Sequence, residues 1–221
     1  MLAIIKSRRG ETLIEVLVAT IVLIVGALAS ARLFAIATVN NDLTKERVIA
    51  TNLAREGLEA VRVIRDTNWL RFAGDRRTCW NNLDPSECVD SGGGYSIDPI
   101  RHRQQYVARF DPNNYRWELQ SAGLGGRLDL YDGVGDSDAD YQLKIDANGL
   151  YNQFSNGADT PFYREIYTEY LNDDQTQDAL TTEANNILRV TSIVEWYDRG
   201  KINNVTLTTI LTDYLGRKDH N

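Results

Sequence analysis

The hydrophobic pattern begins with an almost uninterrupted apolar run over residues 13–31, in which Glu15 is the only strongly polar residue. A helix needs about 20 apolar residues to cross the hydrocarbon core of a membrane, so the run predicts one transmembrane helix. Three positive charges, Lys6, Arg8 and Arg9, precede the run. Because positive charges collect on the cytoplasmic side, we expect a cytoplasmic N-terminus and an extracytoplasmic remainder.

The helical pattern continues beyond the membrane edge. Apolar or small residues recur at the three- and four-residue steps of one helix face. They are Ile36, Val39, Leu43, Ala50, Leu53, Gly57, Ala60 and Ile64, with Arg47 interrupting one position. No proline occurs before Pro85. We therefore expect one continuous helix over residues 12–66, roughly 80 Å long, whose outer half packs on a folded domain.

The opposite side of this helix is polar. It carries Asn40, Lys45, Arg55, Glu59, Arg62 and Asp66. Residues four apart are neighbours on a helix surface, so we expect weak ion pairs between Arg55 and Glu59 and between Arg62 and Asp66.

From Gln105 onward the apolar period changes to two, which is typical of β-strands. The expected strands cover residues 105–110, 116–120, 127–131, 141–146, 150–154, 162–171, 188–197 and 205–214. Asn148-Gly149 lies between two of them and favours a hairpin with a type I′ turn, whose central residues both need positive φ. Arg199-Gly200-Lys201 is expected to reverse the chain between the last two strands. The pattern predicts an α+β fold.

Alternation in the last two long strands separates two faces of the expected sheet. In the first strand the core face carries Val190, Ser192, Val194 and Trp196, and the other face carries Thr191, Ile193, Glu195 and Tyr197. In the second strand Val205, Leu207, Thr209 and Leu211 line the same core.

Residues 66–94 are expected to form a loop, because they are rich in Asn, Asp, Gly and Arg. Trp69, Phe72 and Trp80 are its expected anchors on the domain.

Cys79 and Cys88 lie close together in the extracytoplasmic part, where the redox environment favours a disulfide. We expect them to pair and to close a short loop. A metal site is the weaker interpretation, since no histidine lies near them.

The N-terminal motif closely resembles that of type IV prepilins. The residues that carry it are Lys6, Arg8, Arg9, Gly10 and the stretch TLIEVLVA at 12–19. The resemblance implies a leader over residues 1–10 that a prepilin peptidase removes after Gly10, methylation of the new amino terminus at Glu11, and assembly with other pilin subunits into a helical filament. One departure is Glu11, since the family usually has Phe there.

The resemblance also implies a domain plan. A long helix over residues 11–66 supports, by its outer half, an antiparallel β-sheet domain over residues 67–221. Loss of Lys6, Arg8 and Arg9 takes the net charge from −7 to −10. An acidic exported surface argues against nucleic acid as a partner.

Glu15 needs a physical reason to lie in an apolar helix, since a charge at the bilayer centre costs roughly 2.5–3.5 kcal/mol on insertion scales. The resemblance implies a partner, the methylated α-amine of a neighbouring subunit. Such a pair would fix one axial stagger between subunits, because other staggers would bury a lone charge. The alternative places Glu15 at the membrane interface without a partner. Glu11 adds a second carboxylate beside the same amine.

The only candidate metal cluster is acidic. It comprises Asp132, Asp136, Asp138 and Asp140. The last three begin like an EF-hand loop, but Tyr141 stands where the turn glycine belongs and Ala147 where the bidentate Glu belongs. An ordinary acidic turn is the preferred interpretation, with calcium as the weaker one. We expect no cofactor.

The sequence carries no enzymatic motif. His102 and His220 are the only histidines, and neither lies in an activating pattern with a cysteine or serine. The glycine clusters at 92–94 and 123–126 read as flexible turns.

The predicted function is that of a minor pilin, a filament subunit held by its N-terminal helix in the inner membrane before the assembly machinery extracts it. The stretch over 22–28 and the large loop-rich domain favour a minor pilin over a major one. The alternatives are a secretion-system pseudopilin and a single-pass adhesin that does not polymerise. A DNA-uptake pilin that uses a basic patch of Arg71, Arg76 and Arg77 is a further alternative, which the net negative charge of the chain disfavours.

Overall fold

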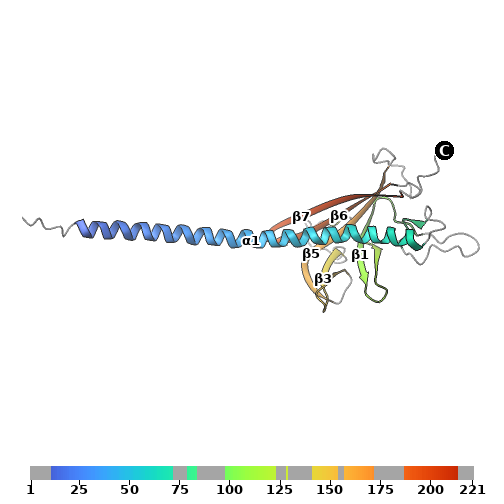
Figure 1. Ribbon diagram of the computed structural model, residues 1–221, viewed down its shortest axis with the longest axis horizontal. Coiled ribbons are helices and arrows are strands. Elements are labelled where there is room, and N and C mark those ends of the chain that lie inside the picture. The colour runs from blue at the N-terminus through green and yellow to red at the C-terminus, as the bar shows by residue number, and fades with distance from the viewer. Residues whose placement is uncertain are drawn as a thin grey trace, which may run out of the picture. The chain divides into compact units, whose positions relative to one another are not determined.

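The structure is a computed structural model that describes residues 11–71, 79–83, 98–122, 128, 141–153, 157–171 and 187–213. The elements it describes are the helix α1 (Glu11–Arg71) and, after it, strands β1 to β7. Its contacts divide the chain into a first unit that ends at Val48 and a second that begins at Ile49. The boundary falls within α1 (Figure 1).

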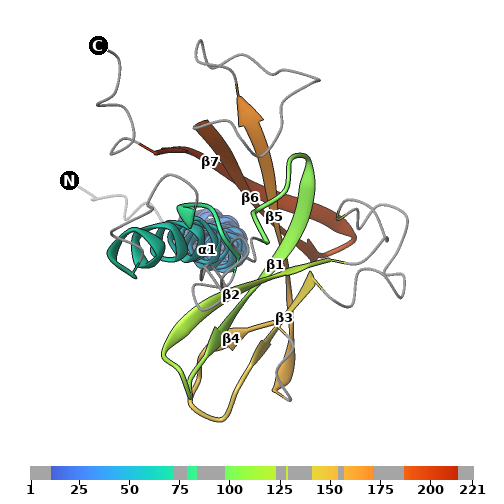
Figure 2. The same cartoon turned by 90° about the vertical axis from the view of Figure 1, so that its right-hand side faces the viewer.

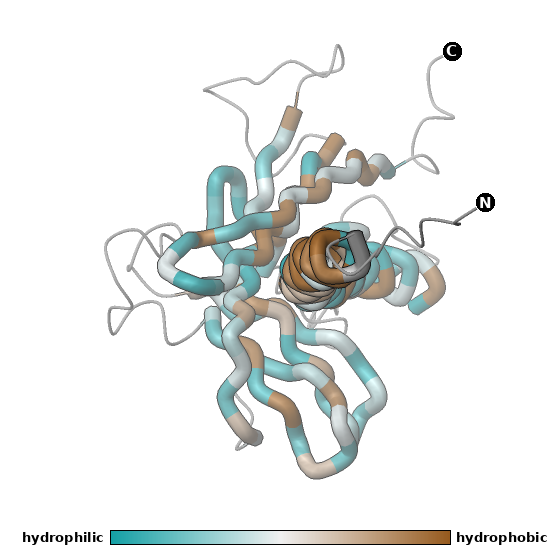
Figure 3. Tube along the Cα trace, turned by 90° about the vertical axis from the view of Figure 1, so that its left-hand side faces the viewer, coloured by the Kyte–Doolittle hydropathy of each residue, from teal (hydrophilic) through white to brown (hydrophobic). Residues whose placement is uncertain are grey.

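The first unit is a single apolar helix. α1 has 61 residues in total, or about 90 Å at the α-helical rise. It is the one helix within the described ranges that is long and apolar enough to cross a membrane. Figure 3 shows its N-terminal stretch as mostly brown, the colour of hydrophobic residues. The predicted transmembrane helix over residues 13–31 is therefore helical throughout and compatible with membrane anchoring.

The helix ends later than the sequence predicts, because residues 66–71 are helical and not part of a loop. Tertiary contacts hold this last turn. Asn68 is fully buried and donates from Nδ2 to the carbonyl oxygens of Trp80 and Asn82, at 3.2 and 2.9 Å. Trp69 is buried, and the Arg65 guanidinium lies 4.4 Å from its ring centroid. The anchors predicted at Trp69 and Trp80 are confirmed.

The second unit contains an antiparallel sheet beside the C-terminal part of α1 (Figure 2). The strands are β1 (Gln104–Asp111), β2 (Arg116–Ser121), β3 (Gln142–Ile145), β4 (Tyr151–Asn152), β5 (Ala158–Leu171), β6 (Ile187–Asp198) and β7 (Lys201–Thr212). β5 is central, with β1 and β3 along one side and β6 along the other. β2 pairs with β1, β4 with β3, and β7 with β6. The α+β prediction is confirmed.

Seven of the eight predicted strands overlap observed strands. The prediction over 127–131 falls almost wholly outside the described residues, of which only Leu128 is described, outside any strand.

The main core lies between one sheet face and the C-terminal part of α1, called here its outer part, which begins at Ile49. The helix contributes Ala50, Leu53, Ala54, Gly57, Leu58, Ala60, Val61 and Ile64. The predicted core face of β6 is confirmed, since Val190, Ser192, Val194 and Trp196 are all buried. In β7 the side chains from Val205 to Leu211 alternate between less and more exposed, as predicted.

The opposite face of the sheet is also partly covered, which the sequence pattern does not predict. Ile193 and Glu195 of β6 are buried. A second apolar cluster explains this burial in part: it comprises Val107, Ala122, Leu128, Tyr141 and Tyr163, with Ile202 packed against it.

The type I′ prediction for Asn148-Gly149 is wrong. Gly149 N donates to Asp146 O at 3.0 Å, so the central residues of the turn are Ala147 and Asn148, and only Gly149 has positive φ. Asp146 fixes the loop, because its Oδ1 accepts from the backbone N–H groups of Asn148 and Leu150.

The two-residue hairpin with positive φ at both positions occurs instead at Arg199-Gly200. Asp198 pairs with Lys201, and the φ values are 48° and 81°. This confirms that residues 199–201 reverse the chain.

The predicted surface ion pairs of α1 do not form as expected. Arg62 pairs with Glu59, three residues away, and Arg65 pairs with Asp66. Since i,i+3 and i,i+4 neighbours are about equally close on a helix, side-chain rotamers decide between them.

Candidate functional site

The apolar part of α1 is the first candidate site. Every side chain described from Leu13 to Lys45 is exposed, including large apolar residues such as Leu23 and Phe34. Soluble monomeric proteins rarely expose apolar patches of more than a few hundred Å². This surface is therefore compatible with membrane anchoring, and it is the part of α1 that a partner would cover.

Glu15 lies one turn into α1 and is exposed. Glu11 is the first residue of α1, but its side chain lies outside the described part, as do Lys6, Arg8, Arg9 and Gly10. The predicted processing site is thus adjacent to the observed start of the helix, and its geometry is not described.

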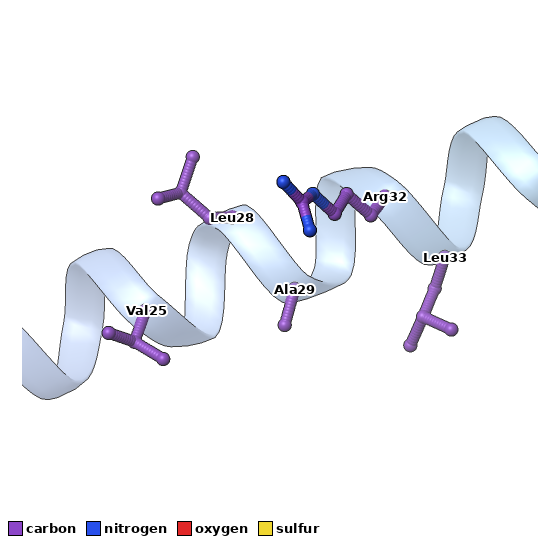
Figure 4. Close-up of a pocket in the computed structure, with 5 residues that line it drawn as sticks. All are labelled: Val25, Leu28, Ala29, Arg32 and Leu33. Carbon is purple, nitrogen blue, oxygen red and sulfur yellow. The ribbon is translucent and has the colours of Figure 1, made fainter.

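Arg32 is the next charged residue after Glu15 among the described residues. A shallow, open hollow lies beside it on the helix surface, lined by Val25, Leu28, Ala29, Arg32 and Leu33 (Figure 4). All five residues come from one stretch of helix, so the hollow cannot enclose a small ligand by itself. The small side chain of Ala29 leaves room there for a side chain of an adjacent helix.

The second candidate is the attachment of α1 to the sheet, which depends on Arg164 of β5. Its side chain is fully buried. Nη1 donates to Leu53 O at 3.3 Å and to Glu56 Oε1 at 2.9 Å, both on α1. Nη2 donates to Ala108 O of β1 at 3.1 Å. One guanidinium thus connects the helix to two strands.

Gln153 completes this network. β3 pairs with β5 up to Tyr163 and β1 pairs with it from Ile166, so the sheet is split beside Arg164. The buried Gln153 side chain fills the split, since Nε2 donates to Arg164 O and Tyr141 O and Oε1 accepts from Ala108 N. A side-chain amide here replaces missing backbone ladder bonds.

Gly57 allows α1 to approach the sheet closely. A Cβ at this position would lie 2.5 Å from Ser192 Oγ and 3.3 Å from Arg164 Cδ. Ser192 Oγ is buried and has no hydrogen-bond partner among the described residues. The sequence identifies Gly57 as part of the docking face but does not reveal this contact.

The sequence pattern alone does carry a signal for Arg164. In the period-two alternation of β5 it shares a face with Phe162 and Ile166, both of which are buried. A charge on the apolar face of a strand is a candidate for a paired buried group.

The segment after α1 is held by a polar network. Asn81 Nδ2 donates to Tyr170 OH at 2.5 Å, and Tyr170 OH donates to Ile100 O at 2.7 Å. Cys79 in this segment is fully buried. Its predicted partner Cys88 lies outside the described residues, so the disulfide stays a prediction.

The other predicted sites are not brought together by the described residues. Arg71 is exposed in the last turn of α1, whereas Phe72, Arg76 and Arg77 lie outside the described part. Asp136, Asp138 and Asp140 lie outside it as well, and no group of three potential metal ligands occurs within it.

His102 has a structural role. Its Nδ1 accepts a hydrogen bond from Tyr170 N at 2.9 Å, and its ring stacks on that of Tyr170. His220 lies outside the described residues.

No family model, curated protein or solved structure matches this chain. Its architecture is pilin-like, with a long apolar N-terminal helix whose outer part packs on an antiparallel sheet.

Proposed function

We propose that this protein is a structural subunit of a type IV pilus-like filament, and specifically a minor pilin. The observation that carries the proposal is one helix with two surfaces. Its first part exposes apolar residues on all sides, with Glu15 as the one charged residue between Leu13 and Ala31, and its last part is buried against a sheet. A glycine preceded by basic residues comes directly before this helix.

The two surfaces suggest two states for the subunit. Before assembly, lipid covers the apolar part of α1 and the sheet domain lies outside the cytoplasmic membrane. Cleavage after Gly10 removes the basic leader, which would otherwise hold the N-terminus in the cytoplasm. The freed helix then exchanges lipid contacts for contacts with neighbouring helices.

Glu15 gives the assembly its register. In a medium of low dielectric an unpaired carboxylate is costly, and an opposite charge on a neighbour offsets that cost only at one stagger. The α-amine of an adjacent subunit is the partner that the N-terminal motif favours.

The firm attachment of α1 to the sheet supports the same proposal. A displayed domain must remain on its helix when the filament is under load. The buried contacts of Arg164 with Leu53 and Glu56, and the close approach at Gly57, supply such an attachment.

Cleavage tests the proposal directly. Replacing Gly10 with a bulky residue should leave a full-length, membrane-retained form, whereas the native chain should yield a mature protein beginning at Glu11. Mass spectrometry of the intact protein distinguishes the two. Native protein that begins at Met1 would contradict the proposal.

Polymerisation is tested separately. Glu15→Leu should still insert into the membrane but should be absent from sheared filaments, with Thr20→Leu as the matched control inside the same apolar run. A chain that is cleaved but never enters filaments would favour a membrane-anchored binding domain. Recovery in a short periplasmic filament would favour a pseudopilin.

A further inference from the structure

We propose that Arg32 of one subunit pairs with Glu15 of another, so that the apolar helices assemble with an axial offset of about 26 Å. This inference rests on the proposed filament and gives Glu15 a different partner from the α-amine that the N-terminal motif favours. It starts from the charges on the exposed surface of α1. From Leu13 to Asn41, Glu15 and Arg32 are the only charged residues.

Both side chains are exposed, and neither has an ion-pair or hydrogen-bond partner among the described residues. They are about 17 residues apart on one straight helix, which corresponds to about 26 Å. They therefore cannot meet within one copy. A partner for either charge must come from outside the helix.

A membrane alone accommodates both charges poorly. The uncharged stretch between them has about 16 residues and spans about 24 Å as a helix, less than the roughly 30 Å of a bilayer hydrocarbon core. An isolated helix must thin the bilayer or extend a charged side chain toward an interface. When Glu15 of one copy pairs with Arg32 of another, the bilayer need not thin and neither charged side chain need extend toward an interface.

Charge balance favours the same partner. After cleavage before Glu11, the positive α-amine and the Glu11 carboxylate lie on the same residue and offset each other. Glu15 is then the unbalanced charge of the apolar helix, and Arg32 is the nearest opposite charge along it. With Arg32 included, the helix from its new terminus through residue 32 is neutral.

The positions also suit a growing assembly. At about 100° per residue, a separation of 17 residues places Glu15 and Arg32 about 100° apart around the helix, on different faces. Each helix therefore offers one face to the copy on one side and another face to the copy on the other. Such a heterologous contact leads to a filament and not to a closed dimer.

Arg32 lies where an adjacent helix can approach. Figure 4 shows its guanidinium extended along the helix surface above Ala29, at the edge of the shallow hollow. A small residue beside a charged one permits close contact between helices together with an ion pair. The occupant of this surface is thus a second copy of the same helix, presenting its Glu15.

The test is a charge cycle in filaments, using the full chain with Arg32→Gln, Arg32→Lys, Glu15→Gln and the double variant Glu15→Gln/Arg32→Gln. Arg32→Gln should lower incorporation at least tenfold, and Arg32→Lys should retain most of it. The double variant should be incorporated no worse than Glu15→Gln alone, because it leaves no charge unpaired. Two results would overturn the pairing. One is incorporation of Arg32→Gln at the native level. The other is a fold-loss of incorporation in the double variant that equals the product of the fold-losses of the two single variants.

Cross-linking provides a second readout. Copies carrying Ala19→Cys should form a disulfide with copies carrying Ala35→Cys inside filaments, because these positions lie one turn beyond Glu15 and Arg32 on the same side of the proposed contact, whereas Ala19→Cys with Ile24→Cys should not. Filaments that contain the native chain but give no 19–35 cross-link would overturn this inference alone. If the native chain enters no filament, both the inference and the proposed function fail.

Discussion

Arg164 Nη1 lies 2.9 Å from Glu56 Oε1, and this ion pair joins the central strand of the sheet to the outer part of α1. The two partners differ in environment, since Arg164 is fully buried and the Glu56 side chain is 35% exposed. The two Nη groups also donate to the carbonyl oxygens of Leu53 in α1 and Ala108 in β1, so the backbone of both elements holds the arginine as well.

The first prediction concerns this pair. Arg164→Met should lower the free energy of unfolding by about 2–4 kcal/mol, because it leaves acceptors on α1, on β1 and on Gln153 without donors. Glu56→Gln should lower it by less, about 1–2 kcal/mol, since the arginine keeps its carbonyl acceptors. Denaturant titration of the detergent-solubilised chain, followed by tryptophan fluorescence, measures both. Arg55→Gln, on the exposed side of the same turn, is the control and should change stability by less than about 0.5 kcal/mol.

The second prediction concerns the closest approach of helix and sheet. Gly57→Ala should destabilise the protein by about 1–3 kcal/mol despite the better helix propensity of alanine, because the added methyl group meets Ser192 Oγ. Ser192→Ala should be neutral or stabilising, since its hydroxyl is buried without a partner among the described residues.

Combining the two substitutions separates this clash from a general effect. Gly57→Ala/Ser192→Ala should recover at least half of the loss, as a double-mutant cycle measures. Gly26→Ala is the matched control, because a Cβ there meets nothing within 4 Å. Strict additivity at positions 57 and 192 would show that the contact does not limit the approach.

The third prediction concerns the β6–β7 hairpin. Arg199 has a φ of 48°, a conformation that costs an ordinary residue roughly 1–2 kcal/mol relative to glycine. Arg199→Gly should therefore raise the thermal midpoint, and Gly200→Ala should lower it. Thermal unfolding by circular dichroism checks both signs. Equal effects of the two variants would contradict the two-residue turn.

The fourth prediction concerns pH. The backbone N–H of Asn113, followed by the side-chain amide of Asn114, holds the pKa of Asp111 below its ordinary value of 3.8. A carboxyl group with a lowered folded-state pKa stabilises the fold above its unfolded pKa and loses that effect as the pH falls through the folded value. Asp111→Asn should thus be less stable than the native chain at pH 7, and the difference should shrink below about pH 4.

A pH series of thermal midpoints for both chains tests this sign. Asp159→Asn, which removes an exposed carboxylate near Lys144, serves as the control. A difference that grows on acidification would contradict the assignment to Asp111.

Local pattern was sufficient for most of the architecture. The three- and four-residue spacing from Ala50 to Ile64 correctly identified the buried side of α1, and the alternation from Val190 to Trp196 identified the core face of β6. Both patterns reflect the interface between α1 and the sheet, which accounts for most of the burial of each element. Where a second interface contributes, as at Ile193 and Glu195, alternation alone could not indicate it.

The errors arose where contacts distant in sequence decide the local structure. The last turn of α1 contains Asn68 and continues because that side chain bonds to a segment more than ten residues later. The turn after β3 is set by the Asp146 carboxylate, which stabilises a longer loop than the Asn148-Gly149 pair suggests. The Arg164 network joins four separate parts of the chain, and no short window contains it.

The central position of β5 determines how the domain opens. Its backbone is bonded to β6 along one side from Phe162 to Leu171, and to β1 and β3 along the other. Deuterium should therefore enter these amides last, at a rate that reports unfolding of the whole sheet. We expect the slowest exchange in the peptide around Arg164. There the Gln153 side chain donates to Arg164 O in the gap between β1 and β3, which keeps water away from the backbone at the centre of the sheet.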